Sequence, residues 1–417
     1  MWKRSKDKLL RILFVIPGYE PAWAFGGTTA GQRILARALA TMGHKVTVYT
    51  TNANGLGGTL DVPLEKPVDL GGVKVIYYPC LPFGPKREFY SYRMMKALQK
   101  NVKQFDIVYL ISMHQLIGVE VPYICSRIGV PVVHHIAGAL NPYILNKGRI
   151  KKLIWWKLFN KPSLKRCAAL HLTGVYEREK TASLLKWSEN FLVPNCIDCS
   201  HFRPRPDLRS SYRSKFGIDD NIPVLVSVGR IDPKKRLDIL IQALAEVKKS
   251  GYDFRLLVVG NDKVKFAFFL KKLAEELDVA DRIIWTGLIA GDKIVGIYAA
   301  GDLLAHISMD ENFGIAVAEA MAVGLPILVT PGVGIWYEVK DKNVGRCVSL
   351  NVDSVAQGII DFLEHREKWE AMRQEAIDIT RERFDAPKVA KLMTRAFLDV
   401  IEGVRSPECR WHSPRGG

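Results

Sequence analysis

The sequence predicts an α/β protein of two doubly wound, Rossmann-like domains. Its 417 residues exceed what one ordinary hydrophobic core holds, so two domains of about 200 residues each are expected. Each half also opens with an apolar run of strand length that ends beside a glycine, at residues 11–17 and 224–229, and a helical pattern follows each run. This succession is typical of parallel sheets covered by helices on both faces.

The first half begins with one strand, loop, helix and strand unit. Residues 11–17 form a continuous apolar run, Gly26 and Gly27 lie in the loop, residues 28–42 have helical spacing, and residues 45–50 form the next strand. The loop therefore follows the carboxyl end of the first strand, where ligands bind in open α/β sheets. Further strand-like runs follow at residues 73–77, 107–111 and 130–134.

The second half repeats this pattern and adds two cations. The strand at residues 224–229 is followed by Arg230 and, five positions later, by Lys235 at the start of a helix. Two cations at the carboxyl end of a strand can neutralise a diphosphate leaving group as its charge develops. Taken alone, they are ordinary surface cations. The later strands are predicted at residues 254–260, 283–287, 303–307 and 327–330.

The domain boundary is expected where prolines and arginines cluster, close to residue 204. We predict an N-terminal domain at residues 1–204 and a C-terminal domain at residues 205–384. Apolar residues at helical spacing predict a last helix at residues 385–403, and residues 404–417 are expected to form a tail.

The most informative stretch contains two carboxylates, Glu311 and Glu319, on either side of a Phe-Gly pair. An apolar run of small residues follows and ends in Gly-Leu-Pro, which predicts a short helix. The backbone amides of Phe313, Gly314 and Ile315 would then lie at the helix start, where phosphate binds readily. The carboxylates could hold hydroxyls of a sugar and of a ribose on either side of that phosphate. The alternative is that both are surface acids that flank a buried helix.

Together these motifs resemble the donor site of the retaining glycosyltransferases of family 4, which have the fold called GT-B. The resemblance covers roughly residues 11–400. It implies two Rossmann-like domains with the active site in the cleft between them. It also implies that the helix at residues 385–403 crosses back toward the first domain. One departure is Asn312, where the family usually has glycine.

The resemblance assigns roles to the residues that match the motif. Glu319 would bind the nucleotide ribose, and Glu311 would approach the donor sugar. The backbone of Phe313, Gly314 and Ile315 would contact the diphosphate. Arg230 and Lys235 would clamp the leaving group, and Gly26 and Gly27 would let the N-terminal backbone approach the donor phosphate. The resemblance thus implies catalytic roles for Glu311, Arg230 and Lys235, and donor-binding roles for the other residues.

The histidine that many family 4 enzymes have near the reacting sugar carbon has no residue of the same type at the matching position here. Many family 4 enzymes close a strand such as residues 130–138 with one, but counting from Pro131 that position falls on Ala137 here. Either His135 substitutes from a shifted loop, or transfer proceeds without an imidazole, since retaining transfer needs no base to activate water. A structural role is open for both His134 and His135.

The resemblance implies a retaining hexosyltransferase that takes a UDP- or GDP-linked sugar to a saccharide or lipid-linked acceptor, in cell-surface polysaccharide or glycolipid synthesis. No Asp-x-Asp sequence occurs, so neither a metal nor another cofactor is expected. Two rival hypotheses remain. One is a GT-B sugar-nucleotide epimerase, and the other is a non-catalytic anion-binding protein on a transferase scaffold.

The charge is unevenly distributed and indicates the partner of the first half. Residues 1–205 hold 30 lysines and arginines against 12 acids, whereas residues 206–417 hold 30 against 31. Residues 147–166 carry eight basic side chains, no acid and two tryptophans. Such a helix can lie in the headgroup region of an anionic membrane. A core-facing helix with a basic solvated side is the alternative, and no recognised nucleic-acid-binding module accompanies the basic region.

The remaining features concern location. The seven cysteines are scattered and do not predict a disulfide framework, so a reducing cytoplasm fits. The basic stretch at residues 147–166 adds the expectation of a peripheral position on the inner face of the plasma membrane. Cys196 and Cys199 form a lone Cys-x-x-Cys without a second ligand pair, which does not favour zinc. No apolar run approaches 18 residues, so nothing requires a transmembrane span.

Overall fold

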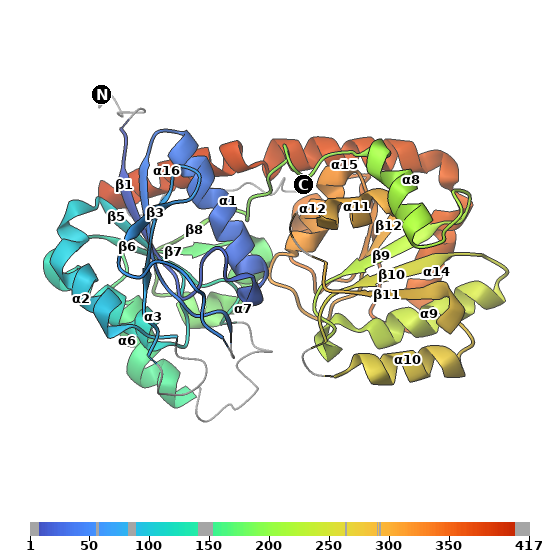
Figure 1. The fold of residues 1–417 in the computed structure, drawn as a ribbon, viewed down its shortest axis with the longest axis horizontal. Helices are drawn as coiled ribbons and strands as arrows, with labels where there is room; N and C mark the ends of the chain where they lie inside the picture. Colours follow the sequence, from blue (N-terminus) through green and yellow to red (C-terminus); the bar gives the residue numbers. More distant parts are fainter. Residues whose placement is uncertain are drawn as a thin grey trace. The chain divides into compact units, whose positions relative to one another are not determined.

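The computed structural model describes residues 8–55, 58–81, 89–140, 153–262, 265–289, 291 and 293–404. The chain divides into two compact units (Figure 1). The N-terminal unit runs to Cys196 and regains the chain from Ala386 onward, and the C-terminal unit is Ile197–Asp385. Each unit contains one predominantly parallel sheet with helices around it, so the predicted α/β class with two domains is confirmed.

In the described part of the N-terminal unit, the sheet has eight strands in the order β3-β4-β2-β1-β5-β6-β7-β8. Only β3 and β4 are antiparallel neighbours; the other pairs are parallel. The strands are β1 (Arg11–Val15), β2 (Lys45–Thr51), β3 (Pro67–Asp69), β4 (Lys74–Tyr78), β5 (Ile107–Leu110), β6 (Val132–His135), β7 (Ala169–Leu172) and β8 (Asn190–Leu192).

Helices cover both faces of this sheet because its strands are apolar on both sides. In β1, Ile12 and Phe14 face one core, which α1 and α16 complete, whereas Leu13 and Val15 face a second core completed by α2 and α3. The helical segments of this unit are η1 (Trp23–Phe25), α1 (Gly27–Thr41), α2 (Tyr92–Asn101), η3 (Val102–Gln104), α3 (Leu116–Ile128), a π-helical turn η4 (Trp156–Asn160), α6 (Lys161–Leu164), α7 (Val175–Leu185) and α16 (Ala386–Ile401).

Among its described residues, the C-terminal unit has six strands, all parallel, in the order β11-β10-β9-β12-β13-β14. The strands are β9 (Val224–Val228), β10 (Arg255–Val259), β11 (Ile283–Gly287), β12 (Leu303–His306), β13 (Ile327–Val329) and β14 (Gly345–Cys347). The helices are α8 (Pro206–Lys215), η5 (Pro233–Lys235), α9 (Leu237–Lys249), α10 (Ala267–Glu276), η6 (Ala280–Arg282), α11 (Lys293–Ala300), α12 (Ile315–Val323), α13 (Trp336–Val339), α14 (Val352–Glu364), η7 (Arg366–Lys368) and α15 (Trp369–Arg383).

The two units meet in the chain at residues 196/197 and 385/386, whereas the sequence placed the first boundary at 204/205. The predicted last helix is α16, drawn red in Figure 1, and it packs against α1 within the N-terminal unit. Its Met393 and Phe397 are fully buried there, and Thr394 Oγ1 lies 2.9 Å from His44 Nε2. Of the predicted tail, residues 405–417 lie outside the described residues.

Asp302 joins three elements of the C-terminal unit at the amino end of β12. Its carboxylate, only 5% exposed, lies 2.8 Å from Arg209 and 2.7 Å from Arg213 on α8, and 3.0 Å from Arg373 on α15. It also accepts the amide of Val224, the first residue of β9. Arg213 is itself 1% exposed. Because buried charges are tolerated only when they are paired, this cluster holds α8 and α15 onto the sheet.

The basic stretch at residues 147–166 is described from Leu153 onward; residues 147–152 lie outside the described residues. Trp156 is buried, but Leu153, Ile154 and Leu158 are about half exposed or more, at 49%, 52% and 64%. The described part of the stretch therefore has an exposed apolar face and also a buried face, with Trp156 and Leu164 in the core, so it fits the core-facing alternative as well as the membrane hypothesis. No helix among the described residues combines the length and apolar character needed to cross a bilayer.

Candidate active site

The carboxyl ends of β9 and β10 approach so closely that only glycine fits between them. A Cβ atom on Gly260 would lie 1.7 Å from the carbonyl oxygen of Gly229. The amide of Gly229 in turn donates to the carbonyl of Val259 at 2.9 Å. This contact fixes the start of the loop that carries Arg230, at the edge of the sheet where ligands bind in this class of fold.

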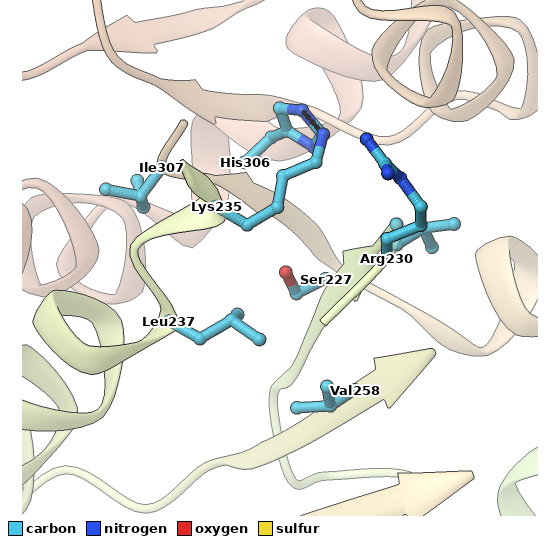
Figure 2. Close-up of a pocket in the computed structure, with 9 residues that line it drawn as sticks. Ser227, Arg230, Lys235, Leu237, Val258, His306 and Ile307 are labelled. Atoms are coloured by element: carbon cyan, nitrogen blue, oxygen red, sulfur yellow. Dashed lines mark hydrogen bonds between the residues drawn. The ribbon is translucent and has the colours of Figure 1, made fainter. Parts of the chain in front are cut away.

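A tight turn then brings Lys235 back to the same edge. Asp232 accepts the amide of Lys234 through its side chain at 2.9 Å, and Arg236 has a left-handed backbone with φ of 49° before α9 begins. A small pocket opens here, lined by Arg230, Lys235 and His306 among others. Figure 2 shows the Lys235 side chain reaching toward His306, with the Arg230 guanidinium on the same side of the pocket.

Lys235, Glu311 and His306 form one polar cluster. The ammonium of Lys235 donates to a Glu311 carboxylate oxygen and lies 3.2 Å from His306 Nε2, which is 3.9 Å from the same oxygen. Burial opposes ionisation of Glu311, but the charge of Lys235 outweighs it and holds the pKa of that carboxyl well below its usual range. Burial, reinforced by the charge of Lys235, lowers the pKa of His306.

These protonation states orient the ammonium group. A neutral His306 presents the lone pair of Nε2 to Lys235, and the ionised Glu311 accepts a second hydrogen. An ammonium group has three hydrogens, so one remains available for a ligand that enters the pocket. The cluster therefore holds a cation in a fixed position rather than on a freely moving side chain, which suits recognition of a diphosphate.

The loop that carries Glu311 is held by its backbone. Met309 donates its amide to the carbonyl of Lys234 at 2.9 Å, and the amide of Gly334 donates to the carbonyl of Glu311 at 2.9 Å. A Cβ atom on Gly334 would lie 2.0 Å from the carbonyl oxygen of Asn312. The close approach of the two loops therefore requires glycine at position 334 of the facing loop. Asn312, where the family usually has glycine, is not among the described residues with positive φ.

Helix α12 begins directly after this loop. Gly314 precedes it with φ of 98°, a conformation that favours glycine, and Phe313 is buried beneath it. The first amides of any α-helix have no intrahelical acceptor, so those at the start of α12 can bind an anion. Glu319 lies one turn further along the helix and accepts the hydroxyl of buried Tyr298 at 2.8 Å. Burial raises the pKa of Glu319 to about 7, although the Tyr298 hydrogen bond partly offsets it.

The structure thus brings three predicted residues, Arg230, Lys235 and Glu311, to one edge of the C-terminal unit, with Glu319 on the adjoining helix α12. Two contributing residues were missed, His306 and Tyr298. His306 is a polar residue that ends an otherwise apolar strand, a signal that could have been noticed. Tyr298 is one aromatic residue within the apolar helix α11, and its position there carries no such signal.

Gly26 and Gly27 lie at the start of α1 in the N-terminal unit. Gly26 precedes the helix with φ of 73°, and a Cβ atom there would meet nothing within 4 Å. The space beside this glycine is therefore open. The predicted connection between β1 and the first helix is confirmed. Its contact with a donor phosphate stays a prediction.

His135 lies in a buried network of the N-terminal unit, 2% exposed. His171 Nε2 is 2.7 Å from the carbonyl of Val193 and so carries its proton, which leaves His171 Nδ1 to accept the Tyr109 hydroxyl at 2.7 Å. His135 Nδ1 lies 3.0 Å from the Tyr109 hydroxyl oxygen and 3.1 Å from Gln32 Nε2. Burial, with the neighbouring histidines, holds the pKa of His135 well below its usual value. These contacts favour the structural alternative for this residue.

Two family models match the chain. The model described as glycosyltransferase family 4 matches residues 25–201, and the model described as glycosyl transferases group 1 matches residues 209–379. Between them the two matches include every site residue discussed above.

Relatives with named activities match most of the chain. Alpha-monoglucosyldiacylglycerol synthase of Streptococcus pneumoniae is 24% identical over 327 residues, which cover 76% of this chain and 71% of that protein. D-inositol 3-phosphate glycosyltransferase of Segniliparus rotundus is 29% identical over 395 residues, which cover 88% of this chain and 81% of that protein. Among solved structures, HepE of Anabaena in complex with UDP and glucose superposes with a TM-score of 0.73 at 20% identity, covering 92% and 98% of the two chains.

Proposed function

Since the chain belongs to the GT-B glycosyltransferases of family 4, enzymes that use nucleotide-sugar donors, we propose that it transfers a hexose with retention at the anomeric carbon. The donor is a UDP- or GDP-linked sugar, and the acceptor is a saccharide or lipid-linked hydroxyl. In this transfer the acceptor oxygen bonds to the anomeric carbon as the bond to the diphosphate oxygen breaks. The acceptor proton passes to the departing phosphate on the same face of the sugar.

The observation that carries this proposal is the cluster of Lys235, Glu311 and His306 beside Arg230. The charge that develops on the leaving diphosphate needs preorganised positive groups. Lys235 is held by two acceptors and has one hydrogen left, and Arg230 lines the same pocket. The amides at the start of α12 add a third source of positive charge. We infer that these groups stabilise the leaving group without a metal ion.

Glu319 is proposed to bind the ribose of the donor. A carboxylate can accept hydrogen bonds from two neighbouring hydroxyls, and Glu319 has one oxygen bound to Tyr298. Its place one turn into α12 puts it beyond the amides proposed to hold the diphosphate. The proposal thus arranges sugar, diphosphate and ribose in the order Glu311, helix start and Glu319.

A lipid-linked acceptor is favoured by charge and by exposed apolar side chains in the N-terminal unit. Leu153, Ile154 and Leu158 are exposed among basic residues, as a helix in an anionic headgroup region would require. One relative is a monoglucosyldiacylglycerol synthase and another acts on an inositol phosphate. We infer peripheral association with the inner face of the membrane, where such an acceptor would be presented.

The donor site is tested by thermal shift with UDP, GDP, ADP and their sugar conjugates, in buffer with EDTA. One nucleotide family is expected to raise the melting temperature of the wild type, because a ligand that binds only the folded state stabilises it by mass action. Glu319→Ala is expected to lose most of that shift. Asp207→Ala serves as the control, because it removes only an exposed ion pair with Arg205. Its thermal shift should equal that of the wild type. No shift with any nucleotide at millimolar concentration would contradict the proposal.

Donor affinity is expected to depend on pH through Glu319. The ribose hydroxyls donate to the ionised carboxylate, whereas the free enzyme holds a proton there up to about pH 7. Binding therefore releases a proton below that pH, and affinity should rise by up to about tenfold per unit as the pH increases toward 7, then level off. Calorimetric titration with the nucleotide sugar measures this.

The nucleotide sugar is the better probe because its diphosphate is esterified at both ends and has no second proton that titrates near pH 6. Glu319→Gln, which keeps the shape and cannot ionise, should bind more weakly and show a flat profile. A variant that keeps the wild-type pH dependence would assign the titration to another group.

A further inference from the structure

Three phenylalanines at the start of α10 form an exposed apolar surface in the C-terminal unit. Phe268 is 79% exposed and Phe269 is 51% exposed, and Phe266 is partly buried beside them. We call Phe266, Phe268 and Phe269 the α10 aromatic cluster. Single exposed apolar residues are common, but adjacent exposed aromatic rings on one helical turn are a feature that marks interaction surfaces.

The cluster is held in place by the structure around it. Asp262 caps the helix, with its carboxylate oxygens 2.7 Å and 2.9 Å from the amides of Phe266 and Ala267. On the opposite face Leu270 is fully buried in the core of the unit. The rings of Phe266 and Phe269 stack with centroids 5.3 Å apart. The helix thus presents the rings outward because its other face is already packed.

Charge around the cluster is complementary to an anionic surface. Lys265 precedes the rings, and Lys271 and Lys272 follow them, all exposed. The acids of this helix, Glu275 and Glu276, lie in its last turn, at the other end. Apolar rings flanked by lysines match the headgroup boundary of an anionic bilayer, where the rings enter the acyl region and the ammonium groups stay with phosphate.

The position of α10 relates the cluster to the pocket of the same unit. The helix follows β10 after a short connection, so its first turn lies toward the carboxyl edge of the sheet. Gly260, which directly follows β10, is the residue that meets Gly229 beside Arg230. Figure 1 shows α10 along the margin of the C-terminal unit. The cluster and the pocket thus belong to the same edge of this sheet.

We propose that the α10 aromatic cluster is a membrane-docking site that inserts into the interface of an anionic bilayer. It is separate from the exposed apolar residues between Leu153 and Leu158 in the N-terminal unit, so each unit has its own contact. Its purpose rests on the proposed function, because it would bring the donor-binding edge to a surface that presents a lipid-linked acceptor. Its existence does not, since binding to vesicles needs neither donor nor acceptor.

The test is sedimentation of the full-length protein with two kinds of vesicle. One is phosphatidylcholine alone, and the other contains phosphatidylglycerol as about a third of the lipid. The double variant Phe268→Ser/Phe269→Ser is expected to bind the anionic vesicles about tenfold more weakly than the wild type. The reason is that two rings buried in the bilayer would contribute strongly to partitioning. Phe268→Leu/Phe269→Leu, which stays apolar, should retain most of the binding. Leu9→Ser, which changes a 62% exposed leucine of the N-terminal unit, is the matched control and should bind as the wild type does.

Three outcomes would overturn the proposal. The serine variant could bind anionic vesicles as tightly as the wild type, or the wild type could bind neither kind of vesicle. The third is a dimer by light scattering without lipid that the serine substitutions convert to a monomer, which would identify a second copy as the occupant. The nucleotide-induced thermal shift of the serine variant is expected to match the wild type. If neither the wild type nor the serine variant shows a nucleotide-induced thermal shift, the proposed function is contradicted, whereas the conclusion from vesicle binding still stands.

Discussion

Replacing Lys235 by methionine is expected to lower kcat by about 10²–10³-fold, the loss typical for removal of one preorganised donor from a developing negative charge. Methionine keeps the length and apolar stem of the side chain but removes the ammonium that contacts Glu311 and His306. The effect should fall on kcat more than on KM, because the leaving diphosphate gains charge in the transition state. Steady-state kinetics with the donor identified by thermal shift measures it.

The substitution has a second effect that must be separated from the first. It leaves Glu311 without its cation in a partly buried site, so the folded protein should also lose stability. The double variant Lys235→Met/Glu311→Gln removes both charges and is expected to regain stability without regaining activity. A single Lys235→Met variant with wild-type kcat would show that this lysine does not stabilise the leaving group.

Replacing Asp302 by alanine is expected to destabilise the C-terminal unit by about 3–5 kcal/mol, the range for removal of one partner from a buried ion pair. The reason is Arg213, which is 1% exposed and would lose its carboxylate partner while it remains buried. Arg209 and Arg373 would lose theirs as well, and the amide of Val224 would lose its acceptor. Differential scanning calorimetry should resolve an earlier transition for this unit.

The control for Asp302 is another aspartate in an arginine pair. Asp207 pairs with Arg205 at 2.5 Å, but its side chain is 59% exposed. Exposed pairs contribute little, so Asp207→Ala should leave the melting profile unchanged. Equal profiles for the two variants would mean that burial of the Asp302 cluster does not determine its contribution. Asp302→Asn tests charge alone, because it keeps one acceptor for the Val224 amide.

Much of the C-terminal site could be predicted from local sequence alone. Arg230 and Lys235 follow β9 and its glycine, and Glu311 follows β12. Parallel strands end at one edge of their sheet, so residues that follow different strands come together there even when the chain separates them widely. The helix that carries Glu319 was likewise predictable from its apolar small residues and from the glycine and proline that end it.

Other properties of the site depend on contacts between elements. Glu311 and Glu319 are the same residue type eight positions apart, yet the pKa of Glu311 is held low by Lys235, whereas burial raises that of Glu319. Nothing local distinguishes them, because a pKa depends on the charges and solvent within a few ångströms, and these come from distant parts of the chain. His306 is marked locally as the polar end of an apolar strand, but its contact with Lys235 and Glu311 likewise depends on packing between distant elements.

By itself the sequence indicated the α/β class, the strands that border the candidate site and the charged residues that follow them, because strand length, helical period and glycine punctuation are local properties. The family was indicated by the resemblance of the motifs around Arg230 and Glu311. Only the tertiary structure decided that the chain crosses between units at residues 196/197, that His135 lies in a closed network with Tyr109 and His171, and that the rings of Phe268 and Phe269 stay exposed. Each of these depends on which surfaces the packed units leave accessible, and accessibility is settled by long-range packing rather than by any neighbouring residue.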